Sequence, residues 1–115
     1  MTRRLLHLVA LAALLAPPAF SQTSPPTGPV AGAEQRMGEA MTRMQRDMSA
    51  MPMTGHADRD WAMMMRRHHM GALEMSQAYL AAGRDAETVR MARKVIEDQT
   101  REIADLDDWL RRHPG

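Results

Sequence analysis

The sequence predicts an all-α fold, in which an antiparallel helical hairpin follows a methionine-rich helix. From about residue 33 onward, apolar residues recur at spacings of three and four, which is the period of an amphipathic helix. No segment shows the alternation of polar and apolar residues that is typical of a half-buried strand. Methionine occurs 13 times and cysteine is absent, so packing and not disulfide bonding must hold the helices together.

The first 21 residues have the pattern of a secretory signal peptide. Arg3 and Arg4 form a short basic start, residues 5–15 are apolar except for His7, and a small-x-small cleavage site ends at Ser21. The apolar run is too short for a membrane span, so we expect export to the periplasm or cell envelope after cleavage near Ser21. An uncleaved anchor or a buried helix is the alternative. Residues 22–32 contain three prolines and two glycines, which predicts a disordered or extended tether.

A methionine-rich helix is predicted over residues 33–50, and it ends before Pro52. Its methionines alternate between spacings of four and three, which places one stripe on one helical face: Met37, Met41, Met44, Met48 and Met51. The turn that follows adds Met53 and His56 as potential ligands. A methionine stripe on its own is more often core or a pliable partner-binding surface than a metal site.

Two further helices are predicted over residues 59–82 and 86–113. Asp58 or Asp60 suits the N-cap of the first helix, Gly83 suits a left-handed position after its end, and Asp85 suits the N-cap of the second. The short connection predicts that the two helices pack antiparallel. One face of the first helix carries several large side chains: Trp61, Met65, His68, Ala72, Met75 and Tyr79.

The predicted domain, residues 33–113 with its hairpin over 58–113, has little apolar surface with which to build a core. Beyond residue 21 there are only nine Leu, Ile and Val residues together. A domain of this size is only marginally stable from burial alone. We therefore expect a small bundle of the ferritin-like or four-helix type, which is completed by a homodimer or locked by a metal.

The candidate metal site lies at Met64, Met65, His68 and His69. Residues three and four apart are neighbours on a helix, so each imidazole has a thioether within one turn. Further ligands could come from elsewhere on the helical faces: Met75, Met41, Met44, Met48, Met51, Met53 and His56. Thioether with imidazole and no thiolate fits Cu(I), with Ag(I) as its analogue and Cu(II) at the histidine-rich end. Paired histidines alone are more often surface residues; together with the methionines they favour a metal site.

One polar residue interrupts the apolar face of the last helix. Gln99 is expected to be a buried hydrogen-bonding residue, and it could orient a ring N–H of His68.

Several functional classes are disfavoured by the sequence. Loss of Arg3 and Arg4 would leave a near-neutral chain, which does not favour nucleic acid as a partner. No nucleophile arrangement, phosphate loop or paired-acid cleft is recognisable, so we expect no enzyme. The sequence predicts a copper buffer or chaperone with a copper-transfer partner. The alternative is a metal-free helical interaction module whose methionine stripes bind a partner or a second copy.

The residues around the histidine pair resemble the domain of unknown function 305 family (DUF305). The resemblance covers about residues 58–110 and depends on an ordered motif: Asp58, Trp61, Met65, His68, His69, Ala72 and Met75, followed by Gln99 and Trp109. It implies a helical bundle in the cell envelope, and some members bind copper through Met and His and help copper resistance. By this likeness, the ligand positions are those of Met65, His68, His69 and Met75.

The sequence departs from the family pattern at four positions. Met70 stands where Gln usually follows the histidine pair. Arg66 and Arg67 stand where the family usually has Ile-Pro, and we expect both to point outward from the site. Leu106 stands where the family often has a methionine.

Overall fold

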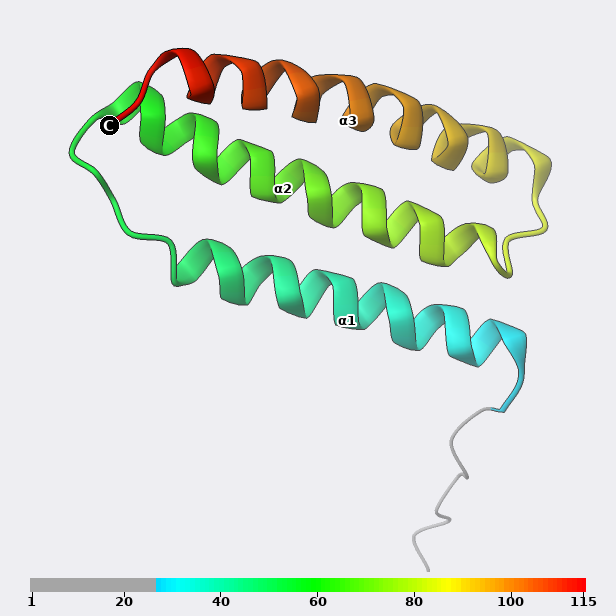
Figure 1. Cartoon of the computed structure of the whole chain (residues 1–115). Helices are drawn as coiled ribbons and strands as arrows, with labels where there is room; N and C mark the ends of the chain where they lie inside the picture. The colour runs from blue at the N-terminus through cyan, green and yellow to red at the C-terminus, as the bar shows by residue number, and fades with distance from the viewer. Residues whose placement is uncertain (1–26) are drawn as a thin grey trace, which may run out of the picture.

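The computed structural model describes residues 27–115, which form three helices: α1 Pro29–Ser49, α2 Ala57–Leu80 and α3 Ala86–Arg112 (Figure 1). The predicted all-α class is therefore confirmed. The predicted signal peptide and residues 22–26 of the predicted tether lie outside the described residues. Within residues 27–115, no helix has the length and apolar character needed to cross a membrane.

The three helices lie side by side in one layer, with α2 in the middle (Figure 1). α2 packs against both neighbours, and α2 and α3 form the antiparallel hairpin that the short connection predicts. α1 and α3 do not approach each other: none of their Cα atoms come within 8 Å. Within residues 27–115, each helix is thus covered by its neighbours on one or two sides only, and no further helix covers the broad faces of the layer.

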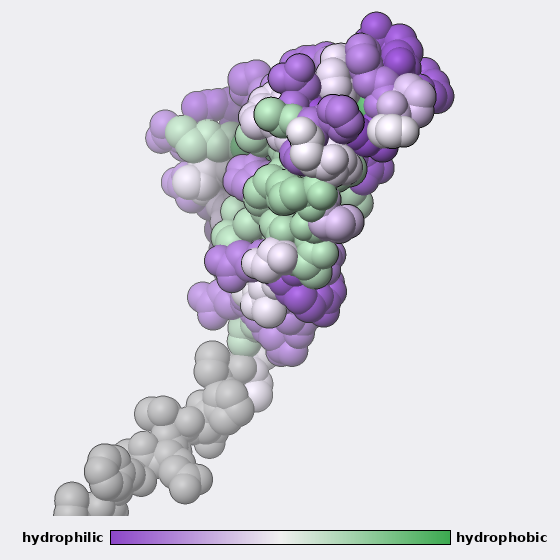
Figure 2. All heavy atoms as spheres, turned by 90° about the vertical axis from the view of Figure 1, so that its left-hand side faces the viewer, coloured by the Kyte–Doolittle hydropathy of each residue, from purple (hydrophilic) through white to green (hydrophobic). Residues whose placement is uncertain are grey.

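This open layer has a thin core, as the composition predicts. Among residues 27–115, the buried apolar side chains are four alanines: Ala33, Ala40, Ala62 and Ala92. Small residues at these positions allow the helix backbones to come close. Because the larger apolar side chains are not fully buried, they remain partly on the surface. Figure 2 shows them as a hydrophobic band with hydrophilic residues on either side.

The ends of α1 and α2 differ from the prediction. α1 begins at Pro29, so residues 29–32 are helical and not part of a tether. Proline suits the first helical turn because backbone N–H groups there have no hydrogen-bond partner within the helix. Neither Asp58 nor Asp60 caps α2. The N-cap is His56, which makes no side-chain capping bond.

Asp60 instead holds the loop that precedes α2. Its carboxylate accepts hydrogen bonds from the Thr54 backbone N–H (2.8 Å), the Thr54 hydroxyl (2.7 Å) and the Gly55 N–H (3.3 Å). These bonds, the Thr54 backbone N–H first, hold the pKa of Asp60 below its ordinary value because they favour the ionised form.

The α2–α3 turn confirms one prediction and corrects another. Asp85 caps α3 by accepting a hydrogen bond from the Thr88 N–H (2.9 Å). Gly83 does not adopt the predicted left-handed conformation; within residues 27–115, only Gly28 and Gly55 have positive φ. Its lack of a side chain serves packing, because a Cβ at this position would overlap the ring of Tyr79.

Candidate metal site

The two adjacent histidines of α2 lie in different surroundings. Arg67 faces α1, where its guanidinium pairs with Asp47 (2.9 Å), and His69 faces α3, where Nε2 lies 2.7 Å from Oε2 of Glu102. Successive helical residues are about 100° apart around the axis. His68 therefore points toward neither neighbour and is exposed, with its ring centroid 6.1 Å from that of His69.

His69 is the packed histidine, and one of its ring nitrogens has no partner. Its side chain is 14% exposed, and the contact with Glu102 uses Nε2 alone. Nδ1 is buried and has no hydrogen-bond partner among the described residues. A buried polar atom without a hydrogen-bond partner lowers the stability of the fold. Nδ1 is therefore the ring nitrogen that is available to bind a ligand.

Gln99 lies next to the carboxylate that holds His69. Its Nε2 donates to Oε2 of Glu102 over 3.5 Å. The sequence predicts that Gln99 is buried and could orient a ring N–H of His68. In the structure Gln99 is only partly buried, and it contacts Glu102, the partner of His69.

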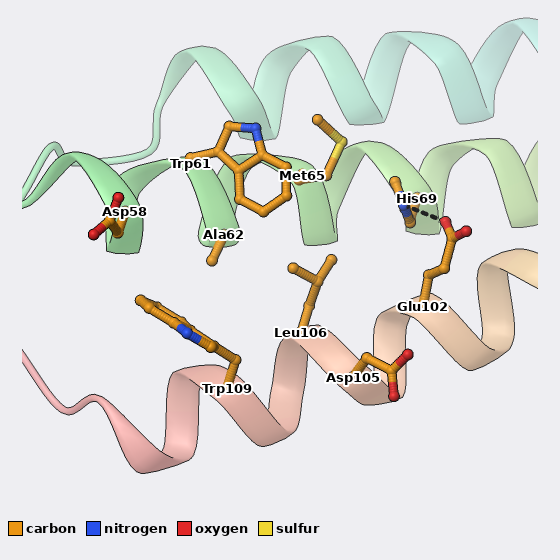
Figure 3. A pocket seen from close by; sticks show the side chains of 9 residues that line it. All are labelled: Asp58, Trp61, Ala62, Met65, His69, Glu102, Asp105, Leu106 and Trp109. Carbon is orange, nitrogen blue, oxygen red and sulfur yellow. Dashed lines mark ion pairs between the residues drawn. The ribbon is translucent and has the colours of Figure 1, made fainter.

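A groove opens beside His69, between the first half of α2 and the second half of α3 (Figure 3). Its volume is about 660 Å³. The walls are mainly apolar, and they come from both helices: Trp61, Ala62 and Met65 on α2, and Leu106 and Trp109 on α3. The polar lining consists of one imidazole and three carboxylates: His69, Asp58, Glu102 and Asp105. Met65 precedes His69 by one turn on the same wall, as their spacing predicts.

Arg66 and Arg67 point away from the groove, as expected, but they reach the neighbouring helices and not solvent alone. Arg66 forms an ion pair with Asp107 of α3, and Arg67, whose side chain is only 13% exposed, pairs with Asp47 and with Glu74 (3.4 Å). Long guanidinium side chains reach carboxylates on the facing helices and cover apolar surface on the way. Their charges are thereby paired, and neither residue lines the groove.

The other candidate ligands are spread over the layer. Met44 packs across the α1–α2 contact, where its side chain lies over the backbone of Gly71. Eight of these candidate ligands do not line the groove: Met41, Met44, Met48, Met51, Met53 and His56, and on α2 Met64 and Met75. Within residues 27–115, no three His, Asp or Glu side chains converge in a metal-binding arrangement. The structure thus places Met65 and His69 in one groove and the other candidate thioethers outside its lining.

Comparison with known families agrees with the resemblance of the histidine motif. Residues 10–110 match the family model described as domain of unknown function (DUF305). The chain belongs to the DUF305 family. The match extends the resemblance beyond residues 58–110 and includes α1. No curated protein and no solved structure matches the chain. Since the family description names no activity, the function of this DUF305 protein must be argued from its own residues.

Proposed function

We propose that this DUF305 protein is a copper-binding protein of the cell envelope, a buffer or chaperone for Cu(I) and Cu(II). The observation that carries the proposal is the state of His69: Nε2 is held by Glu102, while Nδ1 is buried without a partner. Met65 lies one turn away on the same groove wall. Thioether and neutral imidazole are the donors that suit Cu(I) in a chain without thiols.

Glu102 has the role of orienting the imidazole. A carboxylate on one ring nitrogen fixes the ring and raises the basicity of the other nitrogen, and such partners are usual for metal-bound histidines. The amide of Gln99 in turn supports Glu102. The apolar groove walls limit access of water to the donor atoms.

His68 and the neighbouring methionines supply the additional donors in this proposal. His68 is exposed and free of packing, so it can change rotamer toward its neighbour, whose ring lies 6.1 Å away. Met64 and Met75 lie on the same helix. Met41 is exposed on α1, and Met53 and His56 are exposed in the loop before α2; these residues could take part in copper transfer to a partner.

The test is a Cu(I) competition titration against a chromophoric chelator, on the chain from Gln22 onward. We compare Met65→Leu, His69→Ala and His68→Ala/His69→Ala with the wild type. Met91→Leu is the matched control, because Met91 is exposed on α3 away from the groove. Weakening by at least about tenfold in the site variants, about 1.4 kcal/mol, with an unchanged control would support the proposal. Equal affinity in all variants would remove Met65 and His69 from the site.

A metal-free interaction module remains the second candidate, and the thin core favours it. Trp61 and Met53 are 59% and 57% exposed, and the buried apolar side chains of residues 27–115 are alanines. Large exposed apolar surfaces mark interaction sites. Dimerisation in sedimentation experiments that survives both chelator and His68→Ala/His69→Ala would select this candidate over copper binding.

A further inference from the structure

We propose that the groove between α2 and α3 binds a small organic cation, a protonated or quaternary amine with an apolar body. This site goes beyond copper binding and needs no metal. Three features of the groove support this proposal: its charge, its two indoles and its size.

The groove carries negative charge that the described residues do not neutralise. Asp58, Glu102 and Asp105 line it, and no Arg or Lys does. Three other carboxylates on α3 are paired: Asp98 with Lys94, Asp107 with Arg66 and Asp108 with Arg111. Within residues 27–115, by contrast, Asp58 and Asp105 form no ion pair, and the partner of Glu102 is a histidine. An anionic rim beside apolar walls favours a cation that is itself largely apolar.

Both tryptophans of the chain lie in this one groove. Trp61 comes from α2 and Trp109 from α3, and Figure 3 shows their indoles on the two sides of the groove with Ala62 between them. Trp61 is mostly exposed, so a ligand can reach its ring. One face of Trp109 is already covered by the His113 ring, with centroids 4.1 Å apart and planes 13° apart. Indole faces attract cations, and they do so best when the cation is poorly hydrated.

The size of the groove restricts the class of ligand. Small-molecule sites have volumes of roughly 300–1,000 Å³, and this groove has about 660 Å³. A hydrated inorganic ion would gain nothing from the indoles and Leu106, and an anion would be repelled by the carboxylates. An alkylammonium group with an attached hydrocarbon or aromatic body uses the acidic rim, the indole faces and the apolar walls together.

The test is an NMR titration of the ¹⁵N-labelled full chain, as processed by the producing cell, with a copper chelator present. The probes are benzyltrimethylammonium, choline and 3,3-dimethylbutan-1-ol, which is the uncharged isostere of choline. We expect the indole N–H signals of Trp61 and Trp109 to shift with both cations, and benzyltrimethylammonium to bind more tightly than choline. The proposal would be overturned if the indole signal of Trp61 or that of Trp109 did not shift, or if 3,3-dimethylbutan-1-ol bound as tightly as choline.

Isosteric variants test the carboxylates directly. Asp58→Asn/Asp105→Asn should weaken benzyltrimethylammonium binding at least tenfold, while Asp108→Asn, an exposed carboxylate of α3 outside the groove, should leave it unchanged. Asp105→Asn alone should weaken binding about threefold. This single variant replaces the double variant if the latter unfolds, because Asp105 lies away from the ends of α3. Unchanged affinity in both would refute the proposal. Because no copper is present, cation binding can fail or succeed independently of the Cu(I) titration.

Discussion

The contact between α1 and α2 depends on Gly71, and the substitution Gly71→Ala tests how close that contact is. A Cβ at Gly71 would lie 2.5 Å from Sδ, 2.7 Å from Cγ and 2.8 Å from Cβ of Met44. The thioether can swing aside, because it is the flexible end of the side chain. The Cβ of Met44 cannot, since it is fixed to the α1 backbone. The two helices must therefore move apart.

The free energy of unfolding combines two opposing effects. Alanine is a better helix former than glycine by about 1 kcal/mol, whereas overpacking of a close contact costs about 1–3 kcal/mol. Three atoms of Met44 are overlapped, one of them rigidly held, so we expect the steric cost to exceed the helical gain. Gly71→Ala should destabilise the protein by about 1 kcal/mol net.

Urea unfolding followed by circular dichroism measures this difference. Gly38→Ala is the matched control, because Gly38 lies within α1 and a Cβ there would meet nothing within 4 Å. That variant should gain up to about 1 kcal/mol from helix propensity alone. Adding Met44→Ala to Gly71→Ala removes two of the three overlapped atoms, so the pair should cost less than the sum of the single changes. Equal stabilisation by Gly71→Ala and Gly38→Ala would refute the close α1–α2 contact.

Three further outcomes are expected. Hydrogen bonds from Thr54 hold the pKa of Asp60 in the folded protein below its ordinary value. Ionised Asp60 therefore stabilises the fold at pH values above the ordinary pKa, and this contribution is lost as the pH falls through the lowered pKa. The Tm deficit of Asp60→Asn should thus be present at pH 7 and shrink toward pH 2. Copper affinity should fall between pH 7.5 and pH 5, since a protonated imidazole cannot bind a metal, and equal affinity at both would contradict a histidine ligand. Free Ag(I) at about 100 times its Kd should stabilise the protein by about 2.7 kcal/mol, seen as a rise in Tm. A tenfold weaker Kd in Met65→Leu should lower this increment to about 1.4 kcal/mol.

The helices could be predicted from the sequence because the period of the apolar residues and the caps are local signals. Asp85 needs only its own turn to cap α3, and this prediction is confirmed. The errors arise where a contact with a nearby segment overrides the preference of the residue type. Asp60 bonds to a loop six residues earlier, and Gly83 makes room for the Tyr79 ring, so neither takes the position that its residue type favours.

The candidate site could be predicted only within one helix. The spacing of Met65 and His69 places them on neighbouring turns of α2, and the structure puts both in one groove. Glu102 could not be found in this way, because its contact with His69 depends on the register between α2 and α3. The same holds for Arg66 and Arg67, whose partners lie on the neighbouring helices.

The open layer gives the proposed copper site a consequence for folding. The contact between α2 and α3 has little apolar burial, since the buried apolar side chains of the two helices are alanines. A metal at His69 would act at this same contact, since the imidazole already reaches across to Glu102. Ligand binding adds to the free energy of unfolding with the logarithm of free ligand over Kd, whatever the stability of the bare fold. The free energy gained from copper binding is thus a larger share of the total free energy of unfolding in a weakly packed layer than in a protein with a closed core. Copper occupancy and folding of this chain would therefore depend strongly on each other.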